Sequence, residues 1–104
     1  MRVIVADDEF FARKALVKRI GELTREIEFC KEAENGREVL EFLGEEGADL
    51  VVTDIRMPDM DGLEVARQVR EKFPETSVII QSGYADFDYA ATAIRYGVKD
   101  YLTK

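Results

Sequence analysis

Short aliphatic runs alternate along this chain with longer stretches in which apolar residues recur at helical spacing. The run Leu50-Val51-Val52 contains no polar residue and leads into Thr53-Asp54, which predicts a strand buried on both faces. The imperfect alternation at 27–33 is typical of a strand nearer the edge of a sheet. Together the runs predict strands over residues 2–6, 27–33, 49–53, 77–81 and 98–102.

Helical spacing of apolar residues fills the stretches between these strands, and polar residues such as Arg13 take the other positions of the first helix. The predicted stripes are Ala12, Ala15, Leu16, Ile20 and Leu23; Val39, Leu40 and Leu43; Leu63, Ala66, Val69 and Phe73; and Ala90, Ala93 and Ile94. The boundary signals are a turn at Asn35-Gly36, a helix end near Gly44 to Gly47, a cap at Asp61-Gly62, a stop before Pro74 and a stop at Gly97.

Strand and helix alternate with short connections throughout, which predicts a single α/β domain with a parallel sheet and helices on both faces. Four predicted helices must cover two faces, so one face is expected to be less covered than the other. The sequence stops at Lys104, directly after the fifth predicted strand. We therefore expect this chain to be the amino-terminal part of a longer protein.

The charge and composition of the chain argue against several classes of function. The 104 residues carry a net charge of -7 and a pI near 4.6, which argues against binding to nucleic acid phosphates or to an anionic membrane. The apolar runs are far shorter than a membrane span, no signal peptide is visible, and Cys30 has no partner for an internal disulfide, so a cytoplasmic location is expected. The chain has no histidine, the commonest general base and metal ligand.

The residues with candidate chemistry follow the predicted strands. Asp7-Asp8, Asp54, Ser82 and Lys104 stand at strand exits, which all point to the same edge of a parallel sheet. Three carboxylates in one place repel one another unless a cation lies among them, and Mg²⁺ suits a site of oxygen ligands and waters. With a lysine and a hydroxyl at the same rim, the set describes a pocket for a phosphoryl group, and a carboxylate can itself be the nucleophile.

These motifs resemble the receiver domain of bacterial two-component response regulators over residues 1–104. The matching stretches are Val5-Ala6-Asp7-Asp8-Glu9, Thr53-Asp54-Ile55-Arg56-Met57-Pro58-Asp59-Met60-Asp61-Gly62, Ser82-Gly83-Tyr84 and Lys99-Asp100-Tyr101-Leu102-Thr103-Lys104. The resemblance implies a flavodoxin-like, doubly wound sheet of five parallel strands in the order 2-1-3-4-5. Such receivers continue with a proline and a fifth helix after the lysine, and neither is present in this sequence.

The resemblance also implies roles for individual residues. Asp54 would be the phosphoacceptor and a Mg²⁺ ligand. Asp8 would bind Mg²⁺ directly, Asp7 largely through water, and Arg56 through its backbone carbonyl. Ser82 and Lys104 would bind the phosphoryl oxygens, and Tyr101 matches the switch aromatic whose ring reorients as Ser82 moves.

The implied partner is a sensor histidine kinase, which donates the phosphoryl group, so the chain would catalyse only its own phosphorylation and dephosphorylation. A carboxy-terminal output domain would act on transcription, and the stretch 82–90 most resembles receivers that precede AraC-type DNA-binding domains. The receiver itself would not contact nucleic acid or membrane. A homodimer on phosphorylation is open, because the output face lacks the fifth helix.

Structural interpretations of the single residues compete with this one. Asp7 and Asp8 could cap the first helix, Asp54 could be a turn residue, and Tyr101 a core residue. A calcium loop fails, because it would put Met57 at the first ligand position. Three other functions compete with the receiver. An aspartyl phosphatase would need an acidic residue at position 56, which is Arg56, and in a flavin-binding module Asp7-Asp8-Glu9 would repel the phosphate of the flavin. The third is a phosphorylation-independent interaction module.

Overall fold

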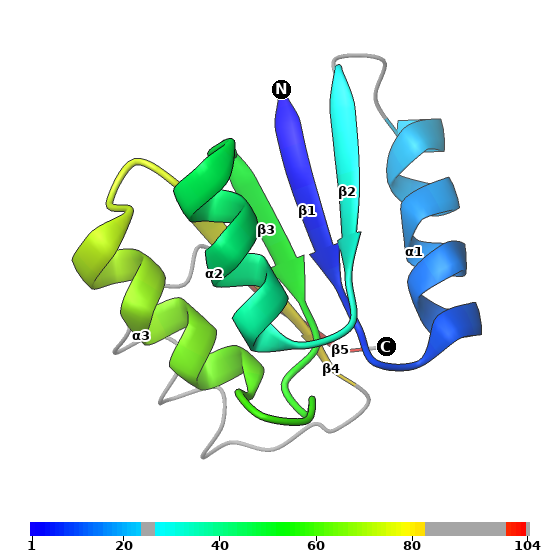
Figure 1. Ribbon diagram of the computed structural model, residues 1–104. Coiled ribbons are helices and arrows are strands. Elements are labelled where there is room, and N and C mark those ends of the chain that lie inside the picture. Colours follow the sequence, from blue (N-terminus) through cyan, green and yellow to red (C-terminus); the bar gives the residue numbers. More distant parts are fainter. Residues whose placement is uncertain (24–26, 83–99, 104) are drawn as a thin grey trace.

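The computed structural model describes residues 1–23, 27–82 and 100–103 (Figure 1). Its strands are β1 (Arg2–Ala6), β2 (Phe29–Ala33), β3 (Leu50–Thr53), β4 (Ser77–Ser82) and β5 (Asp100–Thr103). Its helices over those residues are α1 (Phe10–Leu23), α2 (Gly36–Glu45) and α3 (Gly62–Lys72). The helix predicted around Ala90 lies outside the described residues.

All strand pairs are parallel, and the order β2-β1-β3-β4-β5 confirms the predicted doubly wound sheet. Ala6, the last residue of β1, is paired with Ala33 of β2 and with Thr53 of β3. The next residues of β1 and β3, Asp7 and Asp54, therefore leave the sheet side by side at its carboxyl edge. This edge is where ligands of open parallel sheets bind.

The helices pack on opposite faces of the sheet, with α2 and α3 on one face and α1 on the other (Figure 1). Alternating side chains of β1 supply both cores: Ile4 and Ala6 belong to the α2/α3 cluster, while Val3 and Val5 belong to the α1 cluster. The central strands are apolar on both sides because both sides are covered.

Some strand boundaries differ from the prediction: β2 begins at Phe29 and not at residue 27, β3 begins at Leu50 and not at residue 49, and β4 extends to Ser82. The helix boundaries follow the sequence signals with one correction. Asn35-Gly36 is not a free turn: Asn35 is the N-cap of α2, its side chain accepts the Glu38 N–H at 2.9 Å, and Gly36 is the first helical residue. Asp61 caps α3 as predicted, accepting the Glu64 N–H at 2.8 Å. The α3 helix ends at Lys72, before Pro74.

The contact face of α1 differs from the predicted stripe. Leu16 and Ile20 pack on the sheet as expected, but Ala15 is exposed and Val17 takes part in the packing. Arg13, predicted among the remaining polar positions, is only 6% exposed. The helix therefore presents a face that includes a buried charge. None of the helices in the described ranges combines the length and apolar character that a bilayer crossing requires.

Candidate functional site

Three carboxylates meet at the carboxyl edge of the sheet. Asp7 and Asp8 follow β1 and Asp54 follows β3, and one carboxylate oxygen from each lies within 4.8 Å of the others. Asp7 is buried, Asp54 is half-buried and Asp8 is exposed. The convergence predicted from parallel topology is thus present, with the exposed member on the solvent side.

Backbone hydrogen bonds place Asp54 against β1. Its N–H donates to the Ala6 carbonyl at 2.9 Å, and its Oδ1 accepts the Ile55 N–H at 2.8 Å. The hydroxyl of Thr53, which is fully buried, donates to the Asp54 carbonyl at 2.9 Å. Because these bonds join neighbouring groups of a buried strand end, they hold the carboxylate in one direction at the rim.

The loop after β3 folds back on the same residue. The Gly62 N–H donates to the Ile55 carbonyl at 2.7 Å, and a Cβ at Gly62 would lie 2.1 Å from the Asp54 carbonyl oxygen. A side chain is therefore excluded at this position. Within the loop, Asp59 has a φ of 69°, a left-handed conformation that Asp tolerates better than most residues.

The start of α2 packs against this loop as well. A Cβ at Gly36 would lie 2.6 Å from the Met60 carbonyl oxygen and 2.7 Å from Cγ2 of Val65. Glycine at position 36 thus lets the start of α2 approach the loop that follows Asp54. The local pattern around Asn35-Gly36 does not predict this contact, because it joins segments that are far apart in the sequence.

The turn after β1 is held by Asp7 itself. Its N–H donates to the Ala33 carbonyl at 3.1 Å, and its Oδ1 accepts the Glu9 N–H at 2.9 Å. Helix α1 begins at Phe10, so Glu9 stands directly before it. Asp7 therefore organises the turn that precedes the helix and does not occupy the capping position considered from the sequence.

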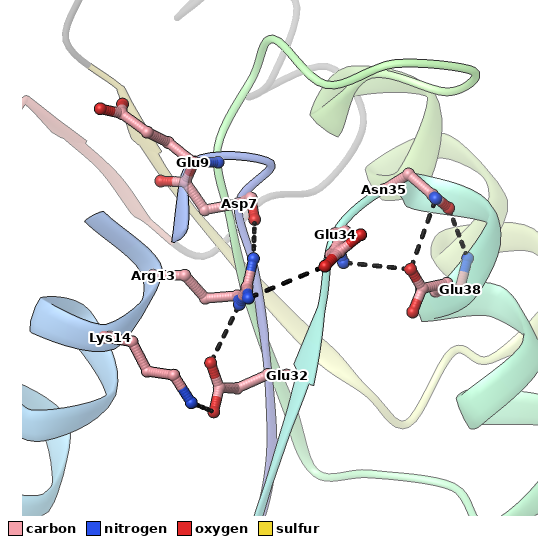
Figure 2. A network of polar contacts seen from close by, with 8 residues as sticks. All are labelled: Asp7, Glu9, Arg13, Lys14, Glu32, Glu34, Asn35 and Glu38. Atoms are coloured by element: carbon pink, nitrogen blue, oxygen red, sulfur yellow. Dashed lines mark hydrogen bonds and ion pairs between the residues drawn. The ribbon is translucent and has the colours of Figure 1, made fainter. Parts of the chain in front are cut away.

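A polar network joins this turn to α1 and β2 (Figure 2). Arg13 donates from Nη1 to the Asp7 carbonyl at 2.9 Å and from Nε to Oε1 of Glu32 at 2.9 Å. Lys14 donates to the other Glu32 oxygen at 2.8 Å. The Lys14 hydrogen bond, followed by that of Arg13, lowers the pKa of the Glu32 carboxyl below its usual value of 4.5. The sequence interpretation did not anticipate Arg13 and Glu32 beside the site.

Other predicted residues lie near the site or outside the described part. Arg56 is exposed in the loop after Asp54. Ser82 ends β4 opposite Thr103, and Tyr101 lies in β5 opposite Ile80. The side chains of Ser82 and Tyr101, and all of Lys104, lie outside the description.

The single cysteine is not part of this chemistry. Cys30 lies in β2, and burial, followed by the nearby Glu32 charge, raises the pKa of its thiol above the usual value of 9.0. A thiol with a raised pKa is a poor nucleophile, so Cys30 is a packing residue of β2.

Comparison with known proteins agrees with this geometry. The family model of the response regulator receiver domain matches residues 3–104. The chain is 40% identical over 102 residues to the DNA-binding transcriptional regulator NtrC of Proteus hauseri, covering 98% of this chain and 21% of NtrC. The first curated relatives are longer, and the chain spans 21% to 48% of their lengths.

Solved structures superpose closely on the fold. The receiver domain of the putative response regulator NarL from Mycobacterium tuberculosis gives a TM-score of 0.89 at 30% identity, covering 98% of this chain and 82% of that one. The response regulator TrrA of Thermotoga maritima, solved in complex with Mg²⁺-BeF, gives a TM-score of 0.85 at 32% identity, covering 99% and 85%. On motif, fold and family match together, this chain belongs to the response regulator receiver domain family.

Proposed function

We propose that residues 1–104 form a phosphoacceptor switch that receives a phosphoryl group on Asp54 in the presence of Mg²⁺. The observation that carries the proposal is the approach of the Asp7, Asp8 and Asp54 carboxylates to within 4.8 Å at the carboxyl edge of the sheet. Gathering three acids is costly without a cation, so the arrangement favours a site that is completed by a metal.

The donor set fits Mg²⁺. The cluster consists of hard carboxylate oxygens, and the exposed member leaves a side open to water. Asp8 and Asp54 would bind the ion directly, Asp7 largely through water, and Arg56 through its backbone carbonyl. When bound, Mg²⁺ would neutralise charge on the transferring phosphoryl group. The complex of TrrA with Mg²⁺-BeF supports this assignment in a relative that is 32% identical.

The residues of the chain supply the nucleophile and its orientation. A carboxylate oxygen of Asp54 forms a bond to phosphorus while the bond from phosphorus to the donor imidazole breaks, and the histidine leaves as neutral imidazole after taking up a proton. The Ile55 N–H, 2.8 Å from Oδ1, orients the carboxylate during this step. The product is an acyl phosphate on Asp54.

The remaining assignments concern the response. Ser82 and Lys104 would bind the phosphoryl oxygens, and Tyr101 would reorient as Ser82 moves. The charge of the phosphoryl group would shift an existing equilibrium between two conformations. Within this function the chain catalyses only its own phosphorylation and dephosphorylation.

The proposed location of the chain is the cytoplasm, and its proposed partners are a sensor histidine kinase as donor and an output domain in the full protein. A transcriptional output is supported by the relative NtrC, which is a DNA-binding transcriptional regulator. The resemblance of residues 82–90 favours an AraC-type output, and dimerisation on phosphorylation is part of the proposal. The chief rival is a phosphorylation-independent interaction module; an aspartyl phosphatase is disfavoured because position 56 is arginine.

The test is the intact mass of the protein after incubation with acetyl phosphate, with Mg²⁺ and then with excess chelator. We expect a Mg²⁺-dependent gain of one phosphoryl mass that is abolished by Asp54→Asn. Asp59→Asn is the matched control, because Asp59 is an exposed acid in the same loop and Asn tolerates its positive φ. Modification that survives Asp54→Asn would overturn the site, and no modification of folded wild-type protein would favour the interaction module.

A further inference from the structure

Arg13 is a buried cation beside the acidic site. It is 6% exposed, whereas its neighbour Lys14 is exposed on the same turn of α1. A guanidinium removed from water must find acceptors for its donors, and the acceptors of Arg13 come from two different strands. Nη1 reaches the Asp7 carbonyl after β1, and Nε reaches the Glu32 carboxylate on β2 (Figure 2).

The residue that Arg13 holds is a member of the carboxylate cluster. Asp7 is bound at its N–H by the Ala33 carbonyl, at its carboxylate by the Glu9 N–H and at its carbonyl by Arg13. The first bond continues the sheet and the second closes the turn. The third ties the turn to helix α1, so the position of the turn depends on a side chain outside it.

We propose that Arg13 is a positioning residue for the metal site. It holds the Asp7 carbonyl, and so sets the turn from which the Asp7 and Asp8 carboxylates face Asp54, while Glu32 fixes the guanidinium. This inference rests on the proposed function. Arginine suits the task because its planar fork reaches two acceptors at fixed angles, while a lysine ammonium is a single point on a flexible stem.

A purely structural role for Arg13 makes different predictions. If Arg13 served only to attach α1 to β2, its replacement would lower the free energy of unfolding and leave the Mg²⁺ affinity of the folded protein unchanged. If it positions the turn, the affinity falls even where the protein is fully folded, because the ligands are no longer held in place before the ion binds.

The experiment measures the dissociation constant of Mg²⁺ by calorimetric titration of the whole chain, well below the thermal midpoint of each variant. We expect Arg13→Gln to raise this constant about 10-fold, the lower end for loss of a group that orients a metal ligand. Arg13→Lys should also raise it, because one ammonium cannot replace both contacts. Lys14→Gln is the matched control. The Lys14 side chain is 49% exposed and contacts the other oxygen of Glu32, so its loss should leave the dissociation constant of Mg²⁺ unchanged.

A second readout separates positioning from loss of folding. The rate of phosphorylation by acetyl phosphate is followed against Mg²⁺ concentration. For Arg13→Gln, the concentration that gives half the maximal rate should rise, and the maximal rate should return at saturating Mg²⁺. Should Arg13→Gln fail to fold, Arg13→Lys and Glu32→Gln are compared in its place, and both should raise the half-saturating concentration.

The outcomes are distinct. An unchanged Mg²⁺ affinity in folded Arg13 variants, with wild-type protein phosphorylated normally, would overturn the role of Arg13 alone. Wild-type protein that neither binds Mg²⁺ nor accepts a phosphoryl group would overturn the proposed function, and this inference with it.

Discussion

The two faces of the sheet are held in different ways. On one face, α2 and α3 bury a large apolar cluster that includes Val39, Val65 and Val69. On the other face, the apolar cluster beneath α1 contains only Val3, Val5 and Val52 as buried residues among those described, with partly buried side chains around them. A cavity of about 250 Å³ borders α1 near Leu16, Arg19 and Gln81, and the charged network of Arg13 completes the attachment.

The difference separates stability from the geometry of the site. Apolar burial is non-directional, so the α2/α3 face resists unfolding without setting the exact position of a loop. Charge-assisted hydrogen bonds are directional, so the α1 face can set the turn at Asp7 while contributing less to the total free energy. We therefore expect substitutions on the first face to act mainly on stability and those on the second to act mainly on the site.

The largest expected effect tests this contrast with one substitution on each face. Leu43→Ala removes a side chain that is 4% exposed in the large cluster and should cost about 2–4 kcal/mol of unfolding free energy. Leu16→Ala on α1 removes a half-buried side chain beside a cavity and should cost roughly half as much. Urea denaturation measures both values. Equal costs would show that the two faces are packed alike.

Replacing one glycine on each side of the sheet tests the same contrast where the backbone is tightly packed and where it is not. Gly62→Ala forces a Cβ against the Asp54 carbonyl and should cost about 1–3 kcal/mol and slow phosphorylation. Gly21→Ala on α1 is the matched control, because beyond the backbone of its own helix a Cβ there would meet nothing within 4 Å, and the higher helix propensity of alanine should stabilise the protein by about 0.5–1 kcal/mol. Thermal unfolding and the acetyl phosphate assay give the two readouts. Normal phosphorylation of Gly62→Ala would mean that the loop can move without disturbing Asp54.

The smallest expected effect is the pH dependence of the stability that Glu32 contributes on the α1 side of the sheet. Hydrogen bonds from Lys14 and then Arg13 lower the pKa of Glu32 in the folded protein below 4.5. A carboxyl with a lowered pKa stabilises the fold above its unfolded pKa, and this stability disappears as the pH falls through the folded pKa. The stability difference between wild type and Glu32→Gln should therefore be constant above pH 4.5 and shrink below it. Urea denaturation across that range measures it, and a pH-independent difference would contradict the assignment.

Much of the fold and the site follows from local pattern. The apolar run before Asp54 predicts the buried strand β3, and the apolar stripe over 63–73 predicts the buried face of α3. Both predictions need only a few neighbouring residues, because the spacing of apolar residues shows which face of an element is buried. Parallel topology then brings Asp7 and Asp54 to one edge without any further information, since strand exits in such a sheet share a side. The carboxylate cluster was predictable for this reason.

Other features depended on the tertiary structure. Arg13 is buried because Asp7 and Glu32 accept its donors, and Glu32 lies 19 residues away on another strand. Its position in α1 is as polar as that of Lys14, so no periodicity distinguishes the two. Likewise, the close approach of Gly36 to Met60 joins the start of α2 to the loop between β3 and α3 and leaves no local signal.

The sequence by itself determined the order of the elements, the parallel sheet and the gathering of three acids at its carboxyl edge. Tertiary structure alone decided which charge of α1 is buried, which side of that helix meets the sheet and where glycine is required by close approach. The physical reason is the distance along the chain over which each feature is determined. The hydrophobic pattern within one element shows which of its faces is buried, whereas the partners of a buried charge lie on other elements that come together only on folding.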